Sequence, residues 1–232
     1  MTNLTNTRRG GFYFDATNKP YLSTTEILKI INKPALSYWF GREVYRAMLV
    51  DPTLDEKTAL AAPYKVTGGA KSRGTTVHSI VEAYKTTGAV IENIPEEFKG
   101  YATAFYQFIK DHKVDIIDQE KTIFDHVNKV AGTLDMYNKI GDSLHITDVK
   151  TGKDIYDEVR LQLSSYAYMQ RADGKQVDEI SVLLLETGTD GKPTGKYKFQ
   201  TLEEDWEAFM AARTLYLWNN KEKLIKLGYI KS

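Results

Sequence analysis

The sequence predicts an α/β (α+β) protein in which a mixed central β-sheet is flanked by helices. Three strand-like runs follow one another along the chain, at residues 115–125, 129–139 and 143–150. The connection around Gly141-Asp142 is typical of a hairpin, so these runs predict an antiparallel meander. A helical stripe from Asp154 precedes a strand at 180–185, and this strand–helix–strand order implies a parallel crossover.

The composition is that of an ordinary packed protein with restricted metal chemistry. Its 232 residues are 42% hydrophobic and 12% aromatic, which is enough for a sizeable core. There is no cysteine, so disulfides, thiolate zinc sites and cysteine-ligated iron–sulfur clusters are excluded. Any metal must be bound by oxygen or imidazole, and this donor set favours Mg²⁺ or Mn²⁺.

The charge distribution bears on nucleic-acid binding. The formal net charge is zero, so a global basic field cannot be the basis of such binding, and a phosphate path must be local. No acid lies between Glu56 and Glu82, whereas the interval contains four cations, Lys57, Lys65, Lys71 and Arg73. Chance also produces such a gap in a chain with 27% charged residues.

The sequence lacks membrane and secretion signals. No run of 18 apolar residues is present, and the N-terminal stretch has no apolar centre like that of a secretory signal. We therefore expect a cytoplasmic protein, in a bacterium or a phage-infected host, with no membrane partner. A mitochondrial location is less favoured, because the first residues resemble a transit peptide only weakly.

The first third of the chain is expected to be helical. Ser23-Thr24-Thr25-Glu26 has the spacing of a capping box, and Pro34 is a typical first residue of a helix. The expected segments are a hairpin at 12–22, helices that begin near 23 and 34, a short helix from 53 that ends before Pro63, and a flexible loop at 66–74.

Further elements follow the loop. They are a helix through 77–84 that closes near Gly88, a helix from Pro95, the meander, the crossover, a loop at 187–195, a strand at 196–201 and a closing helix at 203–226.

Two short motifs are compatible with hydrolytic chemistry. They are Gly132-Thr133-Leu134-Asp135 and, further along, Ile146-Thr147-Asp148-Val149-Lys150. A strand sends residues i and i+2 to the same face, so Asp148 and Lys150 emerge together. Two acids that bind divalent metal, beside an amine that offsets negative charge, suit phosphodiester hydrolysis. Alone, however, Asp-x-Lys is more often a solvated strand edge.

Two other polar residues occur at notable positions. Gln162 lies within the apolar stripe of the helix after the meander, where an unpaired amide costs about 1–3 kcal/mol. It either contacts a polar group or reaches water at the edge of the stripe. His78 follows the Gly-rich basic segment, although a lone histidine is more often structural. Glu120, on the first strand, is either an extra polar group near a bound metal or a solvent-facing acid, and the solvent-facing position is favoured.

The order of these motifs resembles the RecB-like branch of the PD-(D/E)XK nuclease superfamily, which includes stand-alone phage and mitochondrial exonucleases. The resemblance extends from about Ser23 to Tyr166 and rests on the joint pattern rather than on any one motif. Two departures are present, since Asp135 follows leucine instead of proline and Asp148 replaces glutamate. Members with a cysteine-bound cluster are disfavoured, because no iron–sulfur cluster can be ligated here.

The resemblance implies a restriction-endonuclease-like core and a set of roles. Residues 1–22 would be a tail with a hairpin, and 23–232 one nuclease domain, with a helical region at 23–112 that forms an arch over DNA and a catalytic sheet core at 113–232. The expected catalytic residues are Lys150, Asp148 and Asp135. The expected metal ligands are His78, Asp135, Asp148 and the backbone carbonyl of Val149. The expected DNA contacts are Gln162, Tyr166, Lys71 and Arg73. Alternatively, Gln162 and Tyr166 would support Lys150. Trp39 would stack on a single strand.

The implied function is a DNA exonuclease dependent on Mg²⁺ or Mn²⁺ in phage or bacterial recombination, repair or processing. Its partners would be single-stranded DNA or duplex ends, and a recombination or single-strand-binding protein. The alternatives are an inactive nuclease-fold accessory protein that only binds DNA, a structure-specific endonuclease, and a phosphatase acting on small substrates.

Overall fold

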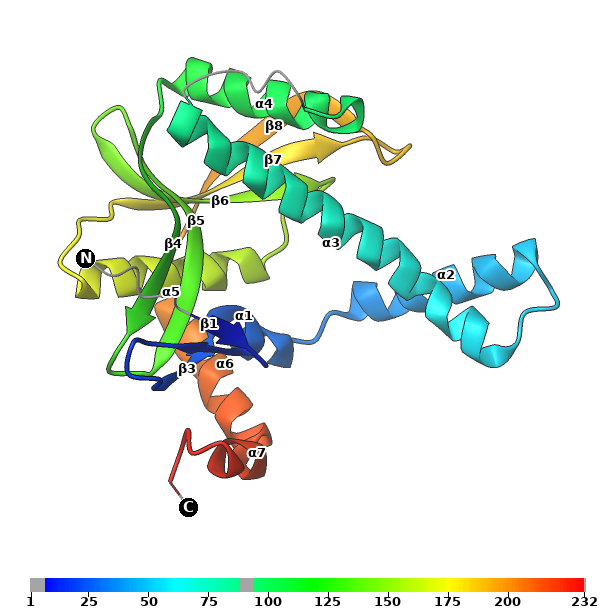
Figure 1. Ribbon diagram of the computed structural model, residues 1–232, viewed down its shortest axis with the longest axis horizontal. Helices are drawn as coiled ribbons and strands as arrows, with labels where there is room; N and C mark the ends of the chain where they lie inside the picture. Colours follow the sequence, from blue (N-terminus) through cyan, green and yellow to red (C-terminus); the bar gives the residue numbers. More distant parts are fainter. Residues whose placement is uncertain (1–6, 88–93, 232) are drawn as a thin grey trace.

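A mixed sheet forms the centre of the computed structural model, which describes residues 7–87 and 94–231, and its middle strands are buried over continuous runs of residues (Figure 1). The strands are β1 (Thr7–Arg9), β2 (Phe12–Phe14), β3 (Pro20–Ser23), β4 (Asp115–Asp125), β5 (Val130–Ile140), β6 (Ser143–Gly152), β7 (Glu179–Thr187) and β8 (Pro193–Leu202). Their order is β1-β2-β3-β5-β6-β7-β8, with β4 also paired to β5. The β4-β5-β6 meander is antiparallel and β6 pairs with β7 in parallel, so the predicted meander, crossover and fold class are confirmed.

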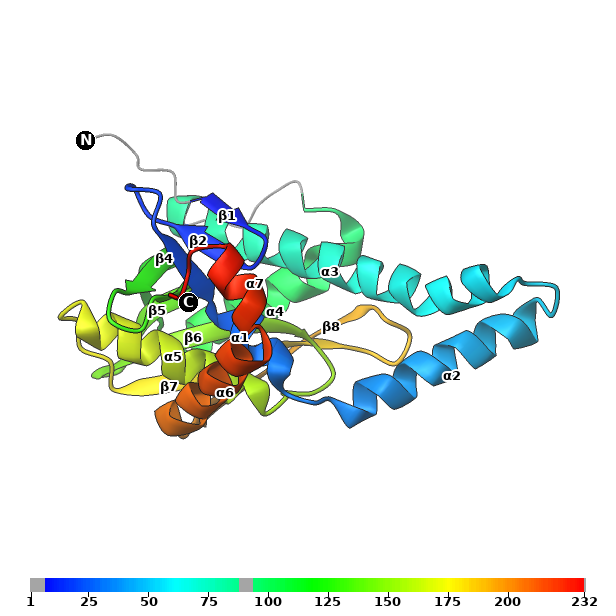
Figure 2. The same cartoon turned by 90° about the horizontal axis from the view of Figure 1, so that it is seen from below.

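Helices cover both faces of this sheet. They are α1 (Thr24–Ile27), the 3-10 turn η1 (Leu28–Ile30), α2 (Pro34–Val50), α3 (Glu56–Thr87), α4 (Glu96–His112), α5 (Glu158–Ala172), α6 (Trp206–Asn219) and α7 (Lys221–Lys226). Apolar residues of α5 and α6 pack on one face together with Leu134 and Ile146. Those of α3 and α4 pack on the other face with Met136 and Val149 (Figures 1 and 2).

One edge of β5 is shared by two other strands. β3 pairs with β5 in parallel at Val130 and Ala131, whereas the described pairing with β6 begins at Met136 opposite Thr147. Residues 132–135, which carry the Gly-Thr-Leu-Asp motif, lie between these two ladders. On the edge of β5 that faces β3 and β6, these residues have no described strand partner, so side chains from other elements can approach them. The candidate site forms there.

Helix α3 contradicts the predicted short helix, flexible loop and separate second helix over residues 53–84. It is one continuous helix from Glu56 to Thr87 that includes Pro63 and the Gly-rich segment. Each glycine costs about 1 kcal/mol in a helix, and composition therefore favoured a loop. Tertiary contacts offset that cost. Helix α2 packs against the N-terminal half of α3, where the rings of Phe40 and Tyr64 are in contact, and the C-terminal half of α3 buries Val77 and Val81.

Other boundaries differ by smaller amounts. Helix α5 begins at Glu158 rather than Asp154, β8 begins at Pro193 within the expected loop, and the closing helix is divided near Asn220 into α6 and α7. The predicted end near Gly88 lies at the limit of the described residues. Over the part of the chain that the structure describes, no helix has the length and apolar character needed to cross a membrane.

Candidate active site

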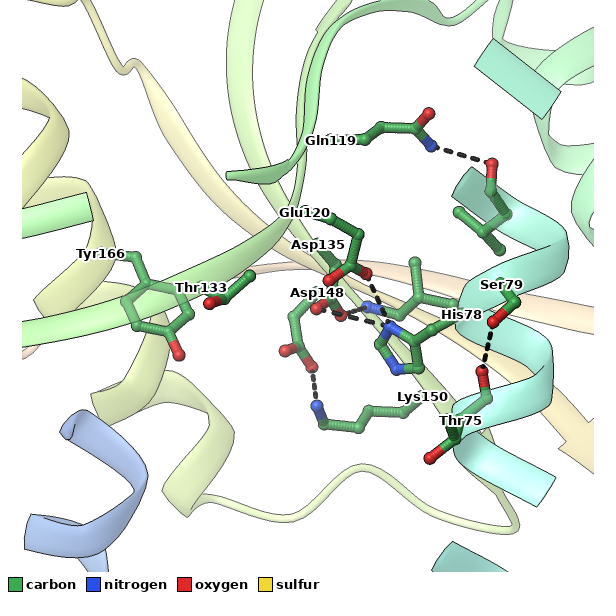
Figure 3. Close-up of polar contacts among 12 residues, drawn as sticks. Thr75, His78, Ser79, Gln119, Glu120, Thr133, Asp135, Asp148, Lys150 and Tyr166 are labelled. Carbon is green, nitrogen blue, oxygen red and sulfur yellow. Dashed lines mark hydrogen bonds and ion pairs between the residues drawn. The ribbon is translucent and has the colours of Figure 1, made fainter. Parts of the chain in front are cut away.

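His78 lies on the side of α3 that faces the sheet, next to the buried residue Val77. Its Nδ1 is 3.2 Å from a carboxylate oxygen of Glu120 and 3.5 Å from one of Asp135 (Figure 3). Burial alone would lower the pKa of His78, but the hydrogen bond with Glu120 and the charge of Asp135 together raise it. The imidazole therefore joins the helix to two neighbouring strands.

Glu120 reaches His78 because the backbone of β4 is irregular at this residue. Its φ is +46°, in the left-handed region that non-glycine residues rarely adopt. A regular strand would point Gln119 and Glu120 to opposite faces. Here both reach α3, since Gln119 Nε2 donates to the Val81 carbonyl at 3.0 Å and Glu120 contacts His78 (Figure 3). Strained backbone of this kind costs about 1–3 kcal/mol and is concentrated at functional sites.

Asp135 lies where the β5–β6 pairing has ended. Its Oδ2 accepts the backbone N–H of Val149 at 2.7 Å, the donor that a neighbouring strand would otherwise satisfy. Burial, followed by the charge of Asp148, raises the pKa of Asp135 to about 7. A buried carboxyl with such a pKa exchanges a proton readily for a cation near neutral pH.

Asp148 and Lys150 lie together, as the i, i+2 spacing predicts. Asp148 is buried, and its Oδ2 is 2.6 Å from Lys150 Nζ, while Gln162 Nε2 donates to its Oδ1 at 3.1 Å. Burial disfavours the charged amine, but Asp148 and Asp135 more than offset this and raise the pKa of Lys150. The lysine is therefore a charged donor beside the carboxylates.

Gln162 and Tyr166 occupy the same face of α5. The Gln162 amide also donates to the Tyr166 hydroxyl at 3.3 Å, which accounts for a polar residue within the apolar stripe. The Tyr166 ring lies so close to Gly132 that a Cβ at this position would overlap it. Glycine is therefore required in the Gly-Thr-Leu-Asp motif by close packing. Because Tyr166 is buried, the geometry favours a supporting contact over a DNA contact.

Three of these side chains are arranged as a metal site would be. One ligand atom from each of His78, Glu120 and Asp135 lies within 4.8 Å of the other two. An imidazole and two carboxylates fit a divalent cation such as Mg²⁺ or Mn²⁺. Asp148 is outside this group of three and is bound by Lys150 and Gln162. The role predicted for the Val149 carbonyl stays a prediction.

The residues predicted to contact DNA away from the central site lie in separate parts of the fold. Arg73 Nη1 donates to the Gly191 carbonyl at 3.3 Å, beside the β7–β8 connection. The side chain of Lys71 lies outside the described residues. Trp39 is on α2, which extends with α3 away from the sheet in both views (Figures 1 and 2).

Sequence reasoning underestimated Glu120, for which a solvent-facing position was favoured. The structure places it on His78 instead. Strand alternation could not indicate this, because the positive φ at Glu120 interrupts it. A signal would have been that Glu120 lies between Gln119 and Lys121, which pair with the residues on either side of Asp135, but using it requires the β4–β5 pairing to be known.

Comparisons with known proteins add the following. No family model matches the chain, and no curated protein matches its sequence. Among solved structures, a candidate exonuclease from Eubacterium rectale is 13% identical, with 91% of this chain and 83% of that chain covered and a TM-score of 0.48. An alkaline exonuclease from Laribacter hongkongensis is 9% identical, with 90% and 91% covered and a TM-score of 0.39. The same exonuclease in complex with dAMP gives 10% identity, coverage of 89% and 91%, and a TM-score of 0.38.

Proposed function

We propose that this protein is a divalent-metal-dependent deoxyribonuclease of the RecB-like type, with exonuclease action favoured over endonuclease action. The observation that carries the proposal is the convergence of His78, Glu120 and Asp135 beside the Asp148–Lys150 ion pair. These residues come from α3, β4, β5 and β6. Metal ligands next to a charged amine are the combination that phosphodiester hydrolysis requires.

Each side chain has a distinct part in this proposal. His78, Glu120 and Asp135 would hold the cation, with Asp148 facing it from β6. A bound divalent ion supplies Lewis acidity at the phosphate and lowers the pKa of a coordinated water. Lys150 holds the attacking water and offsets the negative charge that develops on the phosphate oxygens. Gln162 fixes the orientation of Asp148 through its 3.1 Å hydrogen bond.

The main alternative is an accessory protein that binds DNA without cleaving it. The clustered carboxylates argue against this, because a binding module gains nothing from acids that repel phosphate. Burial, and then the charge of Asp148, raises the pKa of Asp135, so the anionic form of this carboxyl is disfavoured in the absence of a cation. A role in phage or bacterial recombination or repair, together with a recombination or single-strand-binding partner, belongs to the same proposal.

The decisive experiment uses end-labelled linear single strands, linear duplexes and a closed circle, incubated with Mn²⁺, with Mg²⁺ or with EDTA. We expect the linear DNA to be degraded and the circle to remain intact with metal, and no degradation in EDTA. Lys150→Ala should reduce the rate by at least about 100-fold, the scale of losing one charge-stabilising donor.

The matched control is Lys139→Ala, which removes a lysine from β5 whose nearest ion-pair partner is Asp142 at 3.8 Å. It should cleave like the wild type, and circular dichroism should show both variants folded. Cleavage of the circle would assign an endonuclease. Binding without cleavage of any substrate, or full turnover by Lys150→Ala, would contradict the proposed catalysis.

A further inference from the structure

The N-terminal hairpin of β1 and β2 carries two neighbouring arginines that point to opposite faces of the sheet. Arg8 lies directly across the hairpin from Tyr13, and its guanidinium carbon is 5.3 Å from the centroid of that ring. Arg9 lies over Phe14 instead, 5.1 Å from the ring centroid. Phe14 packs against the core cluster that includes residues of α5 and α6, so Arg9 is on that face and Arg8 is on the other.

The Arg8 face of the hairpin continues the face of the sheet that carries the candidate active site. The Tyr13 hydroxyl is 3.1 Å from Thr133 Oγ1. Thr133 precedes Asp135 by two residues on β5, so their side chains share one face of the strand (Figure 3). Burial raises the pKa of Tyr166, and the proximity of Tyr13 and of the two site aspartates raises it further. One ring and one threonine therefore connect Arg8 to the site.

The guanidinium of Arg8 is fixed in position but is not neutralised. Its Nη2 donates to Thr25 Oγ1 at 2.8 Å and is 3.4 Å from Ser23 Oγ. In the part of the chain that the structure describes, Nε and Nη1 have no hydrogen-bond partner, and no carboxylate forms an ion pair with Arg8. Glu26, which follows Thr25, is paired with Lys29 at 2.5 Å. The exposed side chain therefore keeps its full charge and two free nitrogens.

This arrangement fits a phosphate. A planar guanidinium presents its N–H donors as a fork that matches two oxygens of one phosphate group. Because the Tyr13 ring and two hydroxyls already restrict the Arg8 side chain, a ligand would cost it little further conformational entropy. A DNA strand bound at the candidate site would carry phosphates on both sides of the cleaved bond, across the face of the sheet that Arg8 shares.

We propose that Arg8 binds an internal backbone phosphate of the DNA strand that is cleaved beside Asp135, so that the N-terminal hairpin forms one wall of the DNA path. This inference rests on the proposed function and adds a substrate contact on an element outside the cluster of metal ligands. The contact does not depend on base sequence, because a phosphate carries no base identity. Arg9 takes no part in it, since it lies on the opposite face.

The test measures the salt dependence of binding by fluorescence anisotropy, in EDTA so that no cleavage occurs. The probes are dT20 and a blunt 20-base-pair duplex with fluorescein in place of the terminal phosphate, titrated between about 50 and 200 mM salt. Arg8→Ala should weaken binding at the lowest salt by about tenfold, as expected for a charged hydrogen bond. It should also reduce the slope of log affinity against log salt by about 0.7 for the single strand or 0.9 for the duplex.

Two further variants separate a phosphate contact from a structural role. Arg9→Ala is the matched control, because it removes the neighbouring cation from the opposite face, and it should bind like wild type with an unchanged slope. Arg8→Lys should keep the slope, since the charge remains, but lose part of the affinity, since an ammonium lacks the fork. Circular dichroism should show all variants folded.

The possible outcomes decide the inference independently of catalysis. An unchanged salt slope in Arg8→Ala would overturn it, whether or not the affinity falls, because a purely structural role would leave the number of phosphate contacts the same. An equal loss of slope in Arg9→Ala, or no binding of either probe by wild type, would also overturn it. Cleavage with metal could still stand in these cases. A reduced slope in Arg8→Ala alone, in a protein that cleaves no DNA, supports the phosphate contact and contradicts the proposed catalysis.

Discussion

Proton binding at single residues connects the structure of the site to its expected metal chemistry. Asp135 is buried near Asp148, and its pKa rises from an ordinary value of 3.8 to about 7. Because the folded protein holds this proton more tightly than the unfolded chain does, the proton's contribution to stability is full below about pH 4. It is lost as the pH rises toward 7. A divalent cation would replace the proton and compensate the buried charge.

We therefore predict that metal affinity depends steeply on pH below 7. A cation must displace the protons on Asp135 and His78, both of which have raised pKa values. The Mn²⁺ affinity should increase by about tenfold per pH unit for each proton released and become constant once both groups are deprotonated. Calorimetric titration between pH 5.5 and 8.5, in buffers of different ionisation enthalpy, measures both quantities.

Asp135→Asn provides the control for this titration. It should bind Mn²⁺ more weakly and release fewer protons on binding. A wild-type affinity that is constant from pH 5.5 to 7 would show that these groups do not bind the cation.

The position of a site residue could be predicted from the sequence only where the residues that determine it lie close by in the chain. Asp148 and Lys150 were placed together correctly, because strand alternation over two residues requires only β6 itself. The position of Glu120 depends on a positive φ and on α3, which is distant in sequence. The packing of Tyr166 against Gly132 likewise requires α5 and β5 to be in place.

At the scale of elements, the strands were predicted better than the long helix. The strand-like runs of the meander and the Gly-Asp turn are local signals, and the observed bounds differ from the predicted ones by at most two residues. Helix α3 was missed because its glycines and Pro63 are unfavourable locally, whereas its packing on α2 and on the sheet is not visible in a window of sequence.

The continuity of α3 gives a prediction for its glycines. Gly68 and Gly74 lie inside the helix, and a Cβ on either would meet nothing within 4 Å. Gly68→Ala and Gly74→Ala should each increase the free energy of unfolding by about 0.5–1 kcal/mol, since alanine loses less backbone entropy in a helix. Urea denaturation monitored by circular dichroism measures this change.

Gly132→Ala is the contrasting control within the same experiment. Its Cβ would overlap the Tyr166 ring, so this variant should be less stable by about 1–3 kcal/mol. If Gly68→Ala and Gly74→Ala were both destabilising, residues 66–74 would form the loop that composition favoured, not a helix.

The candidate site lies where the helical arm, which consists of α2 and α3, joins the sheet. Of the three clustered side chains, Glu120 and Asp135 come from adjacent strands, whereas His78 comes from α3. The same helix packs against α2 along its N-terminal half, so one continuous element runs from α2 to the site. A cation bound by all three residues would link the arm to the sheet.

This linkage predicts that metal stabilises the entire fold through His78. A ligand at 100 times its Kd stabilises the native state by about 2.7 kcal/mol, which corresponds to about 5–10 °C in Tm for a protein of this size. Wild type should show this increase with Mn²⁺, and chelation should reverse it. His78→Ala should lose most of the increase, because only the two strand carboxylates remain. His126→Ala removes an exposed imidazole that contacts Tyr21 instead of the site, and it should keep the full increase. Equal Mn²⁺ shifts in the two variants would mean that the cation does not bind to α3, and the proposed site would have to be abandoned.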